Sequence, residues 1–251
     1  MMRYRSSNYV IGGLEKQEFV ATGDRASYKG VGLKTLYMAI VTLASAIVFA
    51  ILLLNNATTD FVYWVLPLSA ILAFVCAMLA IIMPRLVPMF GSMYCVLQGV
   101  VVGAVSALIE AYFPGAAMMA LLSTMGVFGV LVVLYSSGII KVGIKMQTFI
   151  LGFLISFLVF SIVTTLVAMF NQAARETLFG DSIFALIISG IAVLLASMVI
   201  LLDLSRVDAI VKQGLHKDYE WTAAFGLIVT LIWLYMEFLR FFMIVYSRSS
   251  K

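Results

Sequence analysis

Two acidic residues near the end of the sequence lie inside long apolar stretches, where a charge is costly. Asp203 lies in segment 198–208 and Glu237 lies in segment 231–242. A carboxylate at the centre of a membrane helix costs roughly 2.5–3.5 kcal/mol on insertion scales, so such a residue is a candidate for function. Gln98 and Arg240 also stand out among the polar residues inside the apolar stretches. Few residues of this chain offer chemistry, and the two acids are the strongest candidates.

Two carboxylates that meet inside a helix bundle would titrate as one unit, because neighbouring negative charges repel each other in a poor solvent. Such a pair is a proton-sensitive latch. Carboxylate oxygens are also the ligands that calcium prefers, so Asp203 and Glu237 are candidate ligands of a permeating calcium ion. A structural alternative stays open, because Arg206 and Arg240 follow the two acids at a spacing of three residues. Residues at this spacing face each other on a helix, so each arginine would neutralise its own acid.

Other kinds of site find no support in the residues. His216 is the single histidine, which excludes a histidine metal centre or a catalytic triad. Cys76 and Cys95 fall in apolar stretches and are predicted to be reduced packing residues. No nucleophile–base pair and no phosphate-binding loop is visible. We therefore expect neither an enzyme nor a bound cofactor, with calcium as the candidate permeant ion.

Composition predicts an all-α polytopic membrane protein with a single helical bundle. The chain is 64% hydrophobic and 11% charged, whereas soluble domains have roughly 25% charged residues. Seven apolar stretches are each close to the roughly 20 residues that cross the hydrocarbon core. Their expected bounds are 34–54, 62–83, 89–110, 116–137, 147–170, 182–204 and 222–246. The membrane domain is then 34–246, between a polar tail at 1–33 and a short tail at 247–251.

The distribution of lysine and arginine predicts that the amino terminus lies in the cytosol. With this orientation, twelve basic residues fall on the inner side and four on or near the outer side. The net charge of +4 follows this topology and does not indicate nucleic-acid binding. Seven spans place the carboxyl terminus outside, whereas a re-entrant last span would place both termini inside. No apolar segment starts near the first methionine, so we expect no cleavable signal peptide.

Helix geometry separates the two acids in depth. The sixth stretch has no helix breaker before Gly214, so its helix is expected to run beyond the membrane edge. Asp203 would then lie about 16 Å before the turn, at 1.5 Å per residue. Glu237 lies about twenty residues after the turn, if the last helix starts near Asp218. The acids would differ in depth by about two turns unless the helices tilt, and direct contact does not follow from the sequence.

Gly99 and Gly103 form a small-xxx-small pattern in the third stretch. This pattern is typical of membrane helices that pack closely against a neighbour. Glycine is common in such helices, so chance is the alternative explanation.

Several segments resemble the Bax inhibitor-1/YccA-like family of membrane proteins, and in particular its bacterial branch. The matching segments are 5–8 (RSSN), 110–115 (EAYFPG), 134–138 (LYSSG) and the long run 217–237 that ends at Glu237. The resemblance covers nearly the whole chain. It implies a seven-helix bundle whose last helix is central and surrounded by the other six. It also implies that the protein lies in the plasma membrane of a bacterium, with the lipid bilayer as a partner.

The resemblance further implies a calcium leak channel gated by protonation of one acid in each of the last two spans. Asp203 matches the first acid and Glu237 the second, and Arg85 is the nearest match for an arginine that bonds to them in the closed form. Two positions depart from the family. The second acid is usually aspartate, and a glutamate often stands where this chain has Gln98, a candidate pathway-lining residue.

A second function of a different class stays open, that of a non-conducting regulator of other membrane proteins. Relatives of the YccA type are associated with a membrane-bound ATP-dependent protease, and others with suppression of cell death. A regulator would act through its tail or its lipid-facing surface. It would tolerate loss of both acids, which separates it from the channel.

Overall fold

The computed structural model of the protein describes residues 25–54, 59–180 and 182–249. Within these ranges the elements are α-helices and one short 3₁₀ helix, and one isolated bridge joins Arg25 to His216. The predicted all-α fold is therefore confirmed. The motif at 5–8 and most of the predicted tail lie outside the described residues.

Seven of the helices are long and apolar enough to cross a membrane. They are α2 (Tyr28–Leu54), α3 (Thr59–Ile82), α4 (Val87–Tyr112), α5 (Ala116–Ser136), α6 (Ile144–Phe170), α8 (Ile183–Lys212) and α9 (Tyr219–Ser249). The seven predicted spans are confirmed, and the chain is a multi-pass membrane protein. The 3₁₀ helix η1 (Pro84–Leu86) makes the tight turn between α3 and α4.

Two helix ends differ from the expected bounds by more than three residues. Helix α2 begins at Tyr28 rather than 34, because the Ser27 hydroxyl accepts the backbone N–H of Gly30 at 3.0 Å, as a helix N-cap does. Helix α8 continues past 204 to Lys212, as the absence of a breaker before Gly214 suggested. Gly214 then turns the chain with a φ of 64°. A short amphipathic helix, α7 (Gln172–Phe179), lies between the fifth and sixth predicted spans.

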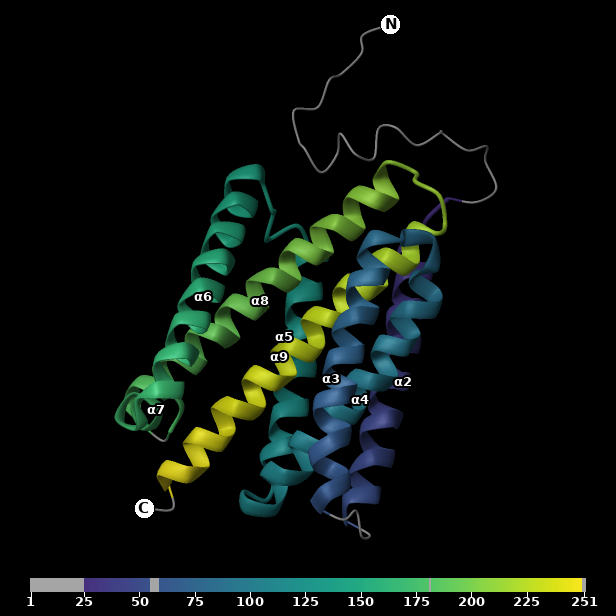
Figure 1. The fold of residues 1–251 in the computed structure, drawn as a ribbon. Coiled ribbons are helices and arrows are strands. Elements are labelled where there is room, and N and C mark those ends of the chain that lie inside the picture. The colour runs from purple at the N-terminus through teal and green to yellow at the C-terminus, as the bar shows by residue number, and fades with distance from the viewer. Residues whose placement is uncertain (1–24, 55–58, 181, 250–251) are drawn as a thin grey trace, which may run out of the picture.

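Helix α9 runs through the bundle between α8 on one side and α2 and α4 on the other (Figure 1). Its main neighbours are α2, α4, α5 and α8. Helix α3 packs mainly on α4, and α6 packs on α7 and α8. The predicted central position of the last helix is therefore confirmed, with four main neighbours, while α3 and α6 pack mainly on other helices.

The two glycines of the small-xxx-small pattern bring α4 against α2. A Cβ atom at Gly99 would lie 2.6 Å from the backbone oxygen of Thr42, closer than real contacts allow. A Cβ atom at Gly103 would collide with the backbone of Ala46. The predicted close helix approach is confirmed, and its partner helix is α2.

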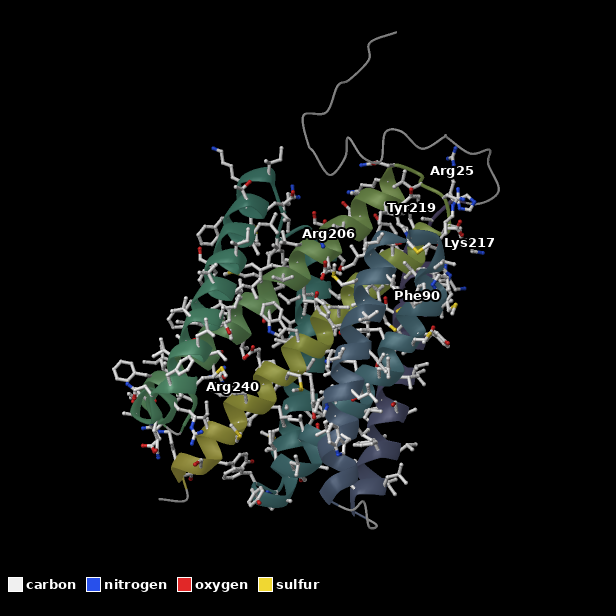
Figure 2. The ribbon with its side chains drawn as sticks, in the orientation of Figure 1. Arg25, Phe90, Arg206, Lys217, Tyr219 and Arg240 are labelled. Atoms are coloured by element: carbon white, nitrogen blue, oxygen red, sulfur yellow. The ribbon has the colours of Figure 1, made fainter. Side chains whose placement is uncertain are left out.

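One end of the bundle, here called the basic end, gathers most of the described cations. It consists of the starts of α2, α4, α6 and α9 and the ends of α3, α5 and α8. Its lysines and arginines are Arg25, Lys29, Lys34, Arg85, Lys141, Lys145, Arg206, Lys212 and Lys217. Figure 2 shows Arg25, Arg206 and Lys217 towards this end and Arg240 towards the other. Helix α9 is continuous over 31 residues, so the last span crosses the bundle and is not re-entrant.

Candidate functional site

Asp203 links α8 to α9 inside the bundle. Its side chain is 4% exposed, and its Oδ2 accepts the hydroxyl of Thr230 on α9 at 2.5 Å. Its Oδ1 accepts a guanidinium N–H of Arg206 at 3.0 Å, while the Arg206 side chain is 58% exposed. Figure 2 labels this arginine near the basic end of α8. Asp203 is thus an interior carboxylate whose counter-charge reaches towards the surface.

The local sequence of α9 makes room for this carboxylate. Gly226 lies one turn before Thr230, and a Cβ atom there would come to 3.7 Å from Asp203 Oδ1. The single hydroxyl proton of Thr230 faces both Asp203 and the Gly226 carbonyl, which lies at 3.1 Å. Because hydrogen bonds to an ionised acceptor are the stronger kind, the bond to Asp203 is the stronger of the two. It ties one helix to the other.

Glu237 lies farther along α9 with fewer partners. Its Oε1 accepts the indole N–H of Trp233 at 3.0 Å. Its Oε2 is buried and has no hydrogen-bond partner among the described residues. The hydroxyl of Ser189 on α8 donates to the backbone carbonyl of Glu237 at 3.5 Å. A buried acceptor without a donor costs about 1–3 kcal/mol, and more if it is charged, so Glu237 remains a candidate functional residue.

The two acids do not converge. Asp203 binds α9 at Thr230, and Glu237 follows Thr230 by seven residues on the same face, or about 10 Å along the axis. Ala196 and Ile200 of α8 and Leu234 of α9 form a fully buried apolar cluster in this part of the α8–α9 interface. The separation of about two turns agrees with the helix arithmetic, while the predicted joint calcium site is not assembled.

Arg206 and Arg240 behave differently. Arg206 neutralises its own acid, as the structural alternative expected. Arg240 donates to the backbone carbonyl of Leu178 in α7 at 3.3 Å, and its charge also acts on Glu237. The short helix α7 is thereby held to α9.

The other two predicted site residues lie away from the acids. Arg85 is exposed in η1, and its charge acts on Tyr219 at the start of α9. Among the described residues, the arginine that bonds to Asp203 is Arg206 and not Arg85. Gln98 is half-buried on α4, beside the glycine that packs against α2. The structure therefore does not place Arg85 or Gln98 in the α8–α9 interface.

A third buried acid, Glu220, was missed by the sequence reasoning. Its side chain is 1% exposed. Its Oε1 accepts the backbone N–H of Ser27 at 2.8 Å and the hydroxyl of the same residue at 3.1 Å. Its Oε2 accepts the ammonium of Lys34 at 2.6 Å. These three residues, the Glu220 cluster, join the start of α2 to the start of α9.

The chain before α2 is also attached to the loop between α8 and α9. The backbone N–H of Ala26 donates to the Leu215 carbonyl at 2.8 Å, next to the bridge between Arg25 and His216. The ammonium of Lys34 lies 5.1 Å from the ring centre of Trp221. An acid at the edge of a span is usually solvated, so Glu220 gave little signal. In the structure Gly30 makes room for this acid, because any Cβ atom there would collide with the Glu220 carboxylate.

The motif at 110–115 has a structural role. The carboxylate of Glu110 accepts the backbone N–H of Gly115 at 2.6 Å and that of Ala117 at 3.1 Å. It therefore caps the start of α5, where Gly115 has a φ of 91° that favours glycine. A negative group at a helix N-terminus is stabilising.

A family model described as "Bax inhibitor 1 like" matches residues 8–247. The matched range includes Asp203, Glu237 and the Glu220 cluster. No curated protein gives a match.

Proposed function

Because the chain belongs to the Bax inhibitor 1 like family, we propose that it is a pH-sensitive calcium leak channel with Asp203 as its latch. The observation that carries the proposal is the bond between Asp203 and Thr230, which connects α8 to α9 at a buried site. Ionised Asp203 accepts hydrogen bonds from both Arg206 and Thr230. Protonation removes the ion pair and weakens the bond, so the two helices separate more easily at low pH.

The α8–α9 interface supports a closed ion pathway that has polar residues at two depths. Asp203 and Thr230 form the first level, and Glu237 forms the second. The apolar cluster of Ala196, Ile200 and Leu234 lies in the same interface. Hydrophobic constrictions stop ions by excluding water. Loosening of the Asp203 latch would let these helices move apart and water enter, and Glu237 Oε2 would then offer a passing cation an acceptor.

Calcium flux into dye-loaded liposomes, at mildly acidic and mildly alkaline pH, tests this mechanism. The wild type is expected to leak more calcium at acidic pH. Asp203→Asn imitates the protonated acid, so its flux should be high at both pH values. Asp208→Asn is the matched control, because Asp208 is an acid on the same helix whose partners, Tyr28 and Lys212, lie at the basic end. This control should keep the pH dependence of the wild type.

A regulator of other membrane proteins, for example of a membrane-bound protease, is the second candidate. The attachment of Ala26 to the Leu215 carbonyl favours it, because it places the start of α2 beside the loop between α8 and α9. A partner bound to the preceding segment could therefore act on both helices. Absence of calcium flux from the wild type at either pH would overturn the channel and favour this regulator.

A further inference from the structure

Helix α6 is the most lipid-exposed helix of the seven. Only 6% of its most apolar stretch is buried inside the protein, the lowest share among the spans. It packs against α8 and the short α7, and Figure 1 shows it on the outer flank of the bundle. Its outward face is therefore a surface that lipid or another protein must cover.

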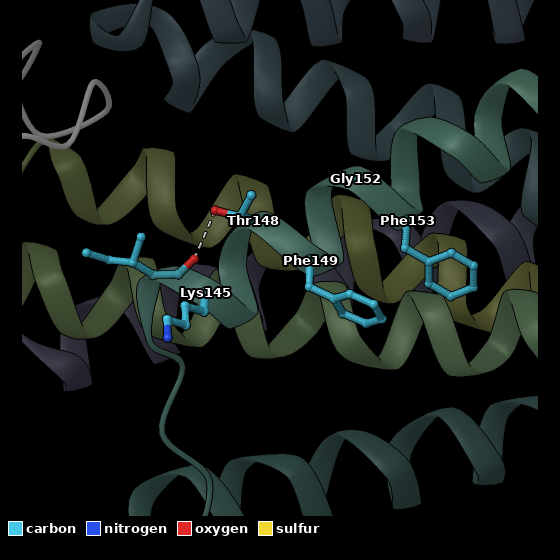
Figure 3. Close-up of a pocket in the computed structure, with 6 residues that line it drawn as sticks. Lys145, Thr148, Phe149, Gly152 and Phe153 are labelled. Carbon is cyan, nitrogen blue, oxygen red and sulfur yellow. Dashed lines mark hydrogen bonds between the residues drawn. The ribbon is translucent and has the colours of Figure 1, made fainter.

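The first three turns of α6 form an open groove on this face, with a volume of about 650 Å³. The groove is lined by Ile144, Lys145, Thr148, Phe149, Gly152 and Phe153. Figure 3 shows the rings of Phe149 and Phe153 along the helix, with Lys145 near the start of α6. The two rings are stacked with centres 6.3 Å apart. Gly152 leaves open space on the same face beside the rings, because a Cβ atom there would meet nothing within 4 Å.

One charged group stands at the head of this apolar groove. The Thr148 hydroxyl is already bonded to the Ile144 carbonyl of its own helix at 3.0 Å, as the dashed line in Figure 3 marks. The ammonium of Lys145 is therefore the polar group that the lining can offer to a ligand. Segment 137–171 contains Lys141 and Lys145 and no acid. In the part of the chain that the structure describes, neither lysine pairs with an acid, unlike Lys34 and Lys212.

We infer that this groove binds a phospholipid with an anionic headgroup. The phosphate lies against Lys145, with Lys141 nearby at the basic end, and one acyl chain lies over Gly152 against the two phenylalanine rings. An anionic lipid is the chosen ligand because its charge complements that of Lys145, and basic residues beside a membrane attract anionic lipids. A second copy of the chain fits less well. In a twofold contact the same patch meets itself, which would bring the Lys145 side chains of both copies together.

Because the groove lies on a turn of α6 that also contacts α8, a bound lipid would affect the interior of the bundle. On another side of the same turn, the Gln147 amide donates to the Ser205 hydroxyl of α8 at 3.3 Å. Ser205 is the neighbour of Arg206, which holds Asp203. A bound lipid would restrict the movement of α6 at its contact with Ser205, close to Asp203. This consequence rests on the proposed channel, whereas the lipid site itself does not.

The test uses the full protein in phosphatidylcholine nanodiscs with trace spin-labelled lipid, either phosphatidylglycerol or phosphatidylcholine. Electron paramagnetic resonance measures the fraction of each lipid that the protein immobilises. The wild type should prefer phosphatidylglycerol. Lys145→Gln should reduce this preference about fivefold, the effect of one basic residue near an anionic surface. Gly152→Leu fills open space in the groove and should reduce the immobilised fraction of both lipids.

Lys29→Gln is the matched control, because it removes one exposed lysine from α2 at the same end of the bundle. It should keep the preference for phosphatidylglycerol. Equal immobilisation of both lipids by the wild type would overturn the site. An equal loss of preference in Lys29→Gln and Lys145→Gln would also overturn it, because the lipid would then be attracted by the total positive charge of the basic end and not by a site at Lys145. The measurement involves no ion flux, so its failure leaves the channel proposal standing.

Discussion

The buried carboxylate of Glu220 joins the start of α9 to the start of α2. It takes bonds from the backbone and hydroxyl of Ser27 and from the ammonium of Lys34. Glu220→Gln keeps the shape and removes the charge. We expect a loss of about 3 kcal/mol of unfolding free energy, the lower end of the cost of breaking a buried ion pair, because Lys34 keeps 15% exposure. Denaturant unfolding of the purified protein in mixed micelles measures this loss.

Asp218→Asn is the comparison for this prediction. Asp218 lies two residues before Glu220, and its side chain is 70% exposed beside His216. Exposed ion pairs contribute little, so its removal should leave the unfolding free energy nearly unchanged. Equal losses in the two variants would contradict a special role of the Glu220 cluster.

The sequence was informative about interior acids and uninformative about their partners. Asp203 and Glu237 stood out because a carboxylate is rare in an apolar stretch. Thr230 did not, since a threonine hydroxyl in a helix normally returns to its own backbone. Glu220 did not, because an acid at the edge of a span is usually in water. Long-range pairing of this kind depends on which helices touch, and spacing along one helix does not contain that information.

At the scale of elements, the contact between α2 and α4 depends on the absence of a side chain. A Cβ atom at Gly103 would collide with the backbone of Ala46, which cannot move as a side chain can. Gly103→Ala should therefore push the helices apart and cost about 1–3 kcal/mol, as overpacking does. A lower midpoint of thermal unfolding, followed by tryptophan fluorescence in detergent, would report the loss.

Gly126→Ala on α5 is the matched control, because a Cβ atom there would meet nothing within 4 Å. It should leave the midpoint unchanged or raise it slightly, since alanine restricts the unfolded chain more than glycine does. If both variants lowered the midpoint equally, general helix flexibility and not the α2–α4 contact would be the cause.

Hydropathy predicted the positions of the membrane-spanning helices well and the residues at which they begin and end less well. The seven spans came from apolar length, and the extension of α8 to Lys212 came from the absence of a breaker before Gly214. Helix α7 was missed because half of its eight residues are polar and the helix is too short for hydropathy to detect. The early start of α2 depends on the Ser27 cap and on the distant Glu220 carboxylate. Such ends are decided by tertiary contacts.

For the whole molecule, the uneven distribution of charge predicts an orientation that can be measured. Of the described lysines and arginines, nine lie at the basic end, and Arg175, Arg240 and Arg248 lie towards the other. By the positive-inside rule the basic end should face the cytosol. Helix α9 crosses the bundle without a break, so the last described residues should lie on the opposite side.

Variants with one added cysteine test this orientation directly. The native Cys76 and Cys95 are both buried, so a membrane-impermeant maleimide should give little background in intact cells. Ser249→Cys should react with the reagent in intact cells. Lys29→Cys, at the exposed start of α2, should react only after the membrane is permeabilised. Reaction of both variants in intact cells would contradict a crossing by α9, and the reverse pattern would invert the orientation and place the lipid groove of α6 in the outer leaflet.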